Sequence, residues 1–280
     1  MNTNYLTVSH GGHSGDIVYS IPLVNHLASL KNVDIRYVII NDRTAEFKPG
    51  VIHPNGSTIM NRNAIEFIKP LLLTIPSISE VLEMSSKNLS PDCFPLDFFR
   101  DIPTVDLGQG SIALWTRKFL GISLDTENAW LNFKKLSPPG KKVVCAFSRR
   151  YRNASIDYNF LNSIDDVSFV GLPDEFQNFI STHKLNSVKY LPTHNSVELA
   201  EVIASSDLFI GNQSFPFSIA EGLKVNRALE VCELCPNVIP SGHGAFDYLN
   251  NAALNNILRI NGFDVHKNSD YGVCDFQIYV

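Results

Sequence analysis

The feature that most constrains the fold is an alternation of short, β-rich segments with helical segments along nearly the whole chain. In the first part of the chain, a strand is expected at 5–9, a helix at 16–30 and a second strand at 33–40. The apolar residues of the helix recur at helical spacing. The second strand is apolar almost throughout, as in a strand that is covered on both faces. This alternation favours an α/β protein with parallel sheets and crossover helices.

A segment from Lys134 to Lys142 (KKLSPPGKK) separates two such alternating halves. Paired prolines with a glycine and flanking lysines are typical of a linker. We therefore expect two Rossmann-like, doubly wound domains, at 1–137 and 138–280, with the last helix packing back on the N-terminal domain. Further helices are expected at 64–73, 112–120, 174–183, 197–204, 214–223 and 246–260, and further strands at 81–84, 143–147, 167–170, 188–191, 208–211 and 228–231.

The composition limits the class of protein. A chain of 280 residues has room for two domains of about 140 residues each. The net charge of -5 argues against a protein that coats nucleic acid non-specifically, but leaves open a nucleic-acid substrate held by a local basic patch. No apolar run approaches the roughly 18 residues of a membrane helix, and the first residues lack the pattern of a secretory signal. We expect a cytoplasmic protein.

The first group of functional candidates follows the first strand, in the segment HGGHSGD at 10–16. This turn is expected at the carboxyl end of a parallel sheet, where ligands bind. Gly12 and Gly15 allow the backbone to approach a substrate closely, although the order of the glycines matches neither the dinucleotide-binding pattern nor the P-loop. Asp16 is either a carboxylate that stabilises the helix N-terminus or a general base for an acceptor hydroxyl. His13 is a candidate to share or replace that role.

The second group follows the first strand of the second half, in the segment SRRYRN at 148–153. Guanidinium groups pair bidentately with phosphate, so arginines at a strand tip suit a diphosphate. A solvated basic loop and a contact with a nucleic-acid backbone are the alternatives. Gly171 and Leu172 form a further turn at the same sheet edge, where the base of a nucleotide could lie. The donor-site candidates of the arginine-containing segment are Ser148, Arg149, Arg150 and Arg152.

The third group is a strand, a polar turn and a helix between residues 208 and 223. Asn212, Gln213 and Ser214 lie beside the expected helix N-terminus, whose unpaired N–H groups and partial positive charge attract phosphate. Glu221 is either a ligand for a ribose hydroxyl or a residue of the solvated helix face.

Two of these segments resemble the heptosyltransferase-like glycosyltransferases, the family of the bacterial lipopolysaccharide heptosyltransferases. The first segment is Gly15-Asp-Ile-Val-Tyr-Ser-Ile-Pro22, and the second runs from Ala204 to Asn212 and on into Ser218-Ile-Ala220. The resemblance implies the two-domain GT-B fold and a nucleoside diphosphate sugar as the donor. It also implies that Asp16 is the catalytic base, because the aspartate of the first motif is the proposed base in that family.

The sequence also departs from the pattern of that family. Heptosyltransferases usually carry aspartate, glycine and histidine in the second motif, where this chain has Gln213, Phe215 and Ser218. A phenylalanine in place of glycine and a serine in place of histidine change the shape and chemistry of the donor pocket. We therefore transfer neither ADP-heptose nor the lipopolysaccharide acceptor to this chain.

The function that we expect is transfer of a sugar from a nucleoside diphosphate sugar to an acceptor hydroxyl, with inversion in a single displacement. We expect no cofactor and no metal, because the arginines and the helix N-terminus can stabilise the departing diphosphate. The acceptor stays open among a glycan, a lipid-linked saccharide and a modified nucleic acid. The alternatives are a glycosyltransferase for a modified nucleic-acid base and a non-catalytic nucleotide- or sugar-binding protein on a GT-B scaffold.

Overall fold

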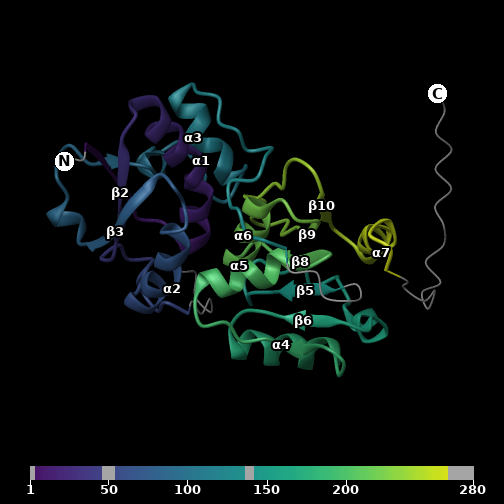
Figure 1. Ribbon diagram of the computed structural model, residues 1–280. Helices are drawn as coiled ribbons and strands as arrows, with labels where there is room; N and C mark the ends of the chain where they lie inside the picture. Colours follow the sequence, from purple (N-terminus) through teal and green to yellow (C-terminus); the bar gives the residue numbers. More distant parts are fainter. Residues whose placement is uncertain (1–3, 46–53, 136–141, 264–280) are drawn as a thin grey trace, which may run out of the picture.

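The protein forms two parallel sheets in a computed structural model that describes residues 4–45, 54–135 and 142–263 (Figure 1). The first sheet has the order β3-β2-β1-β4 and the second has the order β10-β9-β8-β5-β6-β7. We call the parts of the chain that contain them the N-terminal and the C-terminal domain. The strands are β1 (Tyr5–His10), β2 (Asp34–Ile40), β3 (Ile78–Met84), β4 (Phe94–Pro95), β5 (Val143–Ala146), β6 (Val167–Phe169), β7 (Lys189–Tyr190), β8 (Leu208–Asn212), β9 (Arg227–Glu230) and β10 (Ala245–Tyr248).

Helices follow the strands in the order that a doubly wound fold requires. They are α1 (Ser14–Lys31), α2 (Arg62–Leu72), α3 (Ile112–Leu120), α4 (Pro173–His183), α5 (Ser196–Ala204), α6 (Phe215–Leu223) and α7 (Asn251–Ile260), with short 3₁₀ helices η1 (Ser86–Asn88), η2 (Phe98–Asp101) and η3 (Asn159–Ser163). This arrangement confirms the predicted α/β class with two parallel sheets. The predicted boundary at 137/138 lies outside the described residues. None of the helices in the described part of the chain combines the length and the apolar character needed to cross a bilayer.

The end of the described chain differs from the prediction. Residues 246–260 were expected to form one helix, but the chain first forms β10, which pairs with β9 in parallel. Asn250 then caps α7, and its side chain accepts a hydrogen bond from the Ala253 N–H at 2.9 Å. The helix lies at the edge of the molecule far from the N-terminal domain (Figure 1).

The predicted contact between this last helix and the N-terminal domain is therefore wrong. Leu254, Ile257 and Leu258 are buried in an apolar cluster with residues of β5 and β6, within the C-terminal domain. The physical reason is that β10 adds a strand next to β9 at the outer edge of the sheet. A helix that starts three residues after this strand packs on the same sheet.

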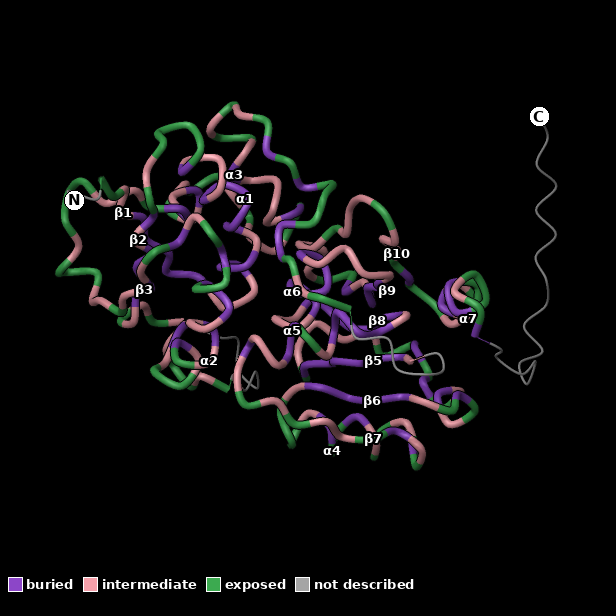
Figure 2. Tube along the Cα trace, in the orientation of Figure 1, coloured by how far each residue is buried: buried purple, intermediate pink, exposed green. Residues whose placement is uncertain are grey.

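A single apolar cluster continues from the N-terminal into the C-terminal domain. It joins Ile17 and Ile21 of α1 to Phe217 of α6, and it also contains residues of β5 and β8. α1 packs against α6, and α2 packs against α5. The strands β5 and β6 are buried along their length (Figure 2). The two domains thus share part of their core, which fixes their relative position.

A buried serine adds a polar contact to this domain interface. The Ser196 hydroxyl accepts a hydrogen bond from the Leu71 N–H at 3.2 Å and donates one to the Ile68 carbonyl at 3.3 Å. Both partners lie in α2 on either side of Pro70, where a helix cannot form its regular backbone hydrogen bonds. Ser196 at the start of α5 therefore supports a locally disturbed helix of the other domain.

We expect Ser196→Ala to lower the free energy of unfolding by about 1–3 kcal/mol, because the variant leaves a buried backbone N–H without its acceptor. Ser181→Ala is the matched control, since Ser181 is exposed and its hydroxyl bonds only within its own helix. The control should change stability by less than about 0.5 kcal/mol. Urea denaturation of both variants measures the difference, and equal stabilities would contradict this account of the interface.

Candidate functional site

The segments at the strand tips meet around one cavity between the two domains. The cavity has a volume of about 1030 Å³. It is lined from the N-terminal domain by the start of α1 and the start of α2, and from the C-terminal domain by the segments that follow β5, β6 and β8. A cavity of this size can hold a ligand larger than a typical drug-sized molecule.

Most of the residues predicted for the site line this cavity. Those that do are His13, Gly15, Asp16, Ser148, Arg149, Arg150, Gly171, Leu172, Gln213 and Ser214. Four predicted residues do not belong to its lining, namely Gly12, Arg152, Asn212 and Glu221.

Asp16 occupies the first turn of α1 and is almost buried. Its Oδ2 atom accepts a hydrogen bond from the His13 N–H at 3.0 Å and forms an ion pair with Arg100. Oδ1 accepts no hydrogen bond from the described residues. Burial acts to raise the pKa of Asp16, but the charge of Arg100, with smaller contributions from neighbouring groups, outweighs burial and holds the pKa below its usual value. Asp16 is therefore a carboxylate at neutral pH, and it belongs to the lining of the cavity.

No local pattern in the sequence indicates a role for Arg100, which lies 84 residues from its partner Asp16. It belongs to η2, just after β4, and β4 pairs with β1. In the same segment, the buried Asp97 accepts hydrogen bonds from the Gly11 N–H at 3.1 Å and from Arg43 Nη1 at 2.8 Å. Pairing of the two strands thus brings a charged segment against the turn that carries Asp16.

Two histidines, His10 and His13, flank the first two glycines of this turn. Nδ1 of the buried His10 accepts a hydrogen bond from the Gly12 N–H at 2.9 Å. Burial lowers the pKa of His10 and also that of His13, which lines the cavity. His13 precedes α1 at the N-cap position, three residues before Asp16.

The segment 148–153, which we call the arginine loop, is hydrogen-bonded to the side chain of Asn212. The Asn212 amide donates to the Ser148 carbonyl at 3.0 Å and to the Arg150 carbonyl at 2.6 Å, and its oxygen accepts from the Ser148 N–H at 3.1 Å. Asn212 has no exposed surface. The prediction that Asn212 contacts the donor directly is therefore wrong, because its buried side chain is hydrogen-bonded to the backbone of the loop.

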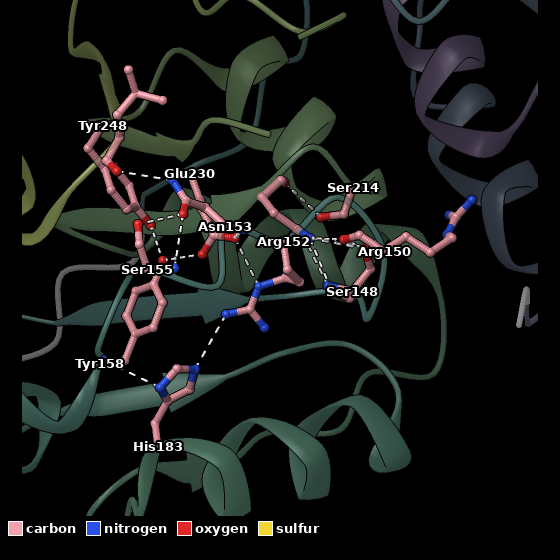
Figure 3. Close-up of polar contacts among 12 residues, drawn as sticks. Ser148, Arg150, Arg152, Asn153, Ser155, Tyr158, His183, Ser214, Glu230 and Tyr248 are labelled. Atoms are coloured by element: carbon pink, nitrogen blue, oxygen red, sulfur yellow. Dashed lines mark hydrogen bonds and ion pairs between the residues drawn. The ribbon is translucent and has the colours of Figure 1, made fainter. Parts of the chain in front are cut away.

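The three arginines of this loop have different environments. Arg150 lines the cavity and has no carboxylate partner among the described residues. Arg149 also lines the cavity, but it is 45% exposed and lies 3.5 Å from a carboxylate oxygen of Asp174. Arg152 points the other way, and its Nε atom donates to Glu230 at 3.0 Å. The prediction that all three arginines face the donor is therefore wrong for Arg152, which instead binds inside the domain (Figure 3).

The turn between β8 and α6 presents Gln213 and Ser214 to the cavity. The Gln213 amide nitrogen donates to the Cys235 carbonyl at 2.8 Å and to the Asn237 side-chain oxygen at 2.7 Å. Ser214 is the N-cap of α6, so the unpaired N–H groups of this helix start at the cavity.

Neither interpretation of Glu221 from the sequence is correct. Glu221 is 2% exposed, and its Oε1 atom accepts from Lys224 Nζ at 2.6 Å while Oε2 binds Arg227. The reason is the direction of α6, which starts at the cavity and runs away from it. Glu221, near the end of this helix, therefore contacts Arg227 at the amino end of β9 and not the carboxyl ends of the strands, where the cavity lies.

The turn after β6 contributes a residue that the sequence analysis missed. Gly171 has a φ of 131°, which disfavours a side chain, and the Leu172 N–H donates to Glu175 Oε2 at 3.2 Å. Glu175 lines the cavity, and burial raises its pKa to about 7. An acidic residue in the first turn of a helix is common, so its position in the sequence did not distinguish it from an ordinary helix start.

Among the residues that the structure describes, no group of three or more His, Cys, Asp or Glu side chains is placed to hold a metal ion. No protein-family model matches the sequence, and no curated protein sequence matches it either.

Solved structures, in contrast, resemble this protein over nearly its whole length. A glycosyl transferase of family 9 from Veillonella parvula is 12% identical, with a TM-score of 0.55, and the match covers 95% of this chain and 93% of that one. The E. coli heptosyltransferase WaaC with ADP-2-deoxy-2-fluoro heptose is 10% identical, with a TM-score of 0.55 and coverage of 92% and 100%. The E. coli ADP-heptose LPS heptosyltransferase II is 11% identical, with a TM-score of 0.56 and coverage of 91% and 96%.

The chain has the heptosyltransferase fold. This confirms the GT-B architecture that the resemblance implied from two short motifs. At identities of 10–12% the likeness concerns the fold, and the chemistry of the site has to be argued from the residues of this chain.

Two positions that depart from the heptosyltransferase motif, Phe215 and Ser218, make contacts within this protein. The ring of Phe215 lies edge-on to that of Phe67 of the other domain, with 6.2 Å between the ring centroids. The Ser218 hydroxyl donates to the Phe215 carbonyl at 2.7 Å, within α6. An aromatic contact between the domains and a helix-internal hydrogen bond thus occupy the places of a glycine and a histidine.

The glycines before Asp16 provide a test of how tightly the turn is packed. A Cβ atom on Gly12 would lie 2.7 Å from His10 Cε1 and 2.9 Å from Asp16 Oδ2, whereas one on Gly15 would meet nothing closer than 3.8 Å. We expect Gly12→Ala to lower the free energy of unfolding by about 1–3 kcal/mol, because overpacking displaces neighbouring groups. Gly15→Ala, the matched control in this heptosyltransferase fold, should change stability little. Thermal and urea unfolding measure both, and a fully stable Gly12→Ala variant would contradict the packing described.

Proposed function

We propose that this protein is a glycosyltransferase that moves a sugar from a nucleoside diphosphate sugar to an acceptor hydroxyl, without a metal ion. The observation that carries the proposal is the arrangement of the cavity. An ionised carboxylate, Asp16, lines it from the N-terminal domain, while the N-terminus of α6 and Arg150, which forms no ion pair with a described carboxylate, line it from the C-terminal domain. The GT-B fold shared with solved heptosyltransferases supports this assignment.

In the proposed reaction, the diphosphate binds on the side of the C-terminal domain. Arg150 and the N–H groups at the start of α6 neutralise its charge, which grows as the bond to the sugar breaks. Arg149 adds a more exposed and partly neutralised guanidinium at the rim. Fixed positive groups of this kind do the electrostatic work that a divalent cation does in other enzymes.

The acceptor is activated on the side of the N-terminal domain. Oδ1 of Asp16 takes the proton of the acceptor hydroxyl, and the oxygen attacks the anomeric carbon while the nucleoside diphosphate leaves. One bond to the anomeric carbon forms and one breaks on the opposite face, so the configuration inverts. Arg100 binds Oδ2 and so directs the other oxygen of Asp16 to the acceptor.

The donor sugar is not taken over from the heptosyltransferases. Phe215 and Ser218 make contacts within this protein where that family carries glycine and histidine. We therefore leave the sugar open and test the donor with a panel of nucleoside diphosphates and their sugar conjugates.

Two variants separate binding from chemistry. We expect Asp16→Asn to slow the release of nucleoside diphosphate from the sugar nucleotide by about 10²–10⁴-fold, with unchanged donor affinity, because it removes a general base. Arg150→Ala should weaken binding by about 10–100-fold, the effect of a lost hydrogen bond between charged groups. Calorimetry and product analysis by mass spectrometry measure these effects.

Arg149→Ala is the matched control for Arg150, and it should weaken donor binding by less than about threefold, since exposed charges contribute little. Tight binding with no turnover of any donor would instead indicate a non-catalytic nucleotide- or sugar-binding protein. No binding of any nucleotide would overturn the proposal.

The ion pair with Arg100 leads to a separate prediction about pH. Asp16 acts as a base only when ionised, and Arg100 holds its pKa down. Arg100→Leu removes this effect, so the pKa of Asp16 rises and the acid limb of kcat/KM moves to higher pH. Arg43→Leu, which removes the partner of Asp97, should leave the position of the acid limb unchanged. An unmoved limb in Arg100→Leu would show that Asp16 is not the titrating base.

A further inference from the structure

The arginine loop crosses the ends of two neighbouring strands. β8 ends at Asn212 and β9 ends at Glu230, and these two residues are paired in register. The loop first contacts Asn212, through Ser148 and Arg150, and then Glu230. The last residues of two adjacent parallel strands therefore hold one loop at two points, and Figure 3 shows the contacts at Glu230.

We propose that Glu230 is a positioning residue for the diphosphate site, which acts through Arg152 to hold Arg150 in the cavity. This inference rests on the proposed function, because it assigns Arg150 to the diphosphate. It adds a residue that lies outside the cavity and that no sequence motif indicated.

Glu230 makes an unusually complete set of contacts for a carboxylate without exposed surface. Oε1 accepts from Arg152 Nε at 3.0 Å and from the Asn153 N–H at 2.6 Å. Oε2 accepts from the Tyr158 hydroxyl at 2.5 Å. A buried charge of this kind is stable only when it is paired and hydrogen-bonded. Loss of the charge of Glu230 therefore weakens the contacts with Arg152 and Asn153 that hold the loop at the end of β9.

Two tyrosine hydroxyls complete the arrangement. The Tyr158 hydroxyl has one proton, which it donates to Glu230, so at its 2.5 Å contact with Tyr248 it must accept. Tyr248 is thus the donor at the outer end of a directed chain. Removing the Tyr158 hydroxyl affects Glu230 directly, whereas removing that of Tyr248 leaves all contacts of Glu230 in place.

Arg152 is held on several sides in addition to its ion pair. Its guanidinium carbon lies 4.7 Å from the ring centroid of Phe147 and 5.8 Å from that of Phe179. Its Nη2 atom lies 3.5 Å from His183 Nε2. The loop therefore has one arginine fixed inside the domain and another, two residues earlier, pointing away from this cluster (Figure 3).

The residue between these arginines explains why the loop needs two anchors. Tyr151 has a φ of 54°, in the left-handed region that is unfavourable for a residue with a side chain. The turn at Tyr151 directs Arg150 and Arg152 to opposite sides. Since Arg150 has no carboxylate partner of its own in the described ranges, the backbone on both sides of it sets its position.

The experiment measures binding of inorganic pyrophosphate by calorimetry, because this probe does not depend on the nucleotide base. We expect Glu230→Gln to weaken binding about tenfold in the wild-type background and less than about twofold in the Arg150→Ala background. Such non-additivity indicates that the two residues act as one unit. Additive effects, or unchanged affinity in Glu230→Gln, would overturn the positioning role.

Glu221→Gln is the matched control. It also removes the charge of a buried, arginine-paired glutamate in the same domain, but its partner Arg227 lies at the amino end of β9, whereas Glu230 lies at the carboxyl end. It should lower the melting temperature and leave pyrophosphate affinity unchanged. Equal loss of affinity in both glutamate variants would mean that the effect is one of general stability, and would overturn the proposal.

Milder variants serve where Glu230→Gln does not fold. Tyr158→Phe should weaken pyrophosphate binding about threefold, again only when Arg150 is present, and Tyr248→Phe should not. If Tyr158→Phe has no effect, the positioning role is overturned. Failure of the proposed function gives a different result from failure of the positioning role. In that case the wild-type protein binds pyrophosphate but neither binds nor turns over any nucleoside diphosphate sugar.

Discussion

The packing of α1 against α6 is the contact on which the rest of the site depends. Both helices start at the cavity, one from each domain, and the apolar residues Ile17, Ile21 and Phe217 bury their shared face. Because the helices start at the same cavity, their first turns lie on opposite sides of it. Asp16 belongs to the first turn of α1, and Ser214 caps α6. An apolar contact thus sets the distance between the proposed base and the helix end proposed to bind phosphate.

The charges around the cavity are divided between the domains in a way that suits two different ligands. On the N-terminal side, Asp16 is paired with Arg100, and Asp97 is paired with Arg43, so that little net charge remains. On the C-terminal side, Arg149 lies near Asp174 and burial raises the pKa of Glu175 to about 7, while Arg150 forms no ion pair with a carboxylate among the described residues. An anionic group is therefore attracted to one side and a hydroxyl to the other. The same division explains why the proposed base stays ionised in a nearly buried position.

The sequence predicted those parts of the site that depend on local pattern. Asp16 and Arg150 lie within a few residues of the ends of β1 and β5, and the tips of parallel strands meet at one edge. What local pattern cannot provide is the direction of a side chain or a partner far away in the chain. Arg152 was misassigned because a turn at Tyr151 reverses its direction, and Glu221 because it lies at the far end of its helix. Arg100, Glu175 and Glu230 were missed because their roles arise from strand pairing and burial. The last helix was misplaced because β10 was not recognised.

The shared core also decides how the site reaches its working geometry. Separating the domains would expose Ile17, Ile21 and Phe217, which are fully buried, and would break the contacts of Ser196 with α2. Burial of side chains of this size stabilises by about 1.5–3 kcal/mol each, so separation is costly. The opposed positions of Asp16 and Arg150 are therefore established by folding and need no large domain movement. In the proposed reaction, negative charge develops on the leaving diphosphate. A site whose positive groups are already in place does not have to reorganise at that moment, and this preorganisation is the source of its catalytic effect.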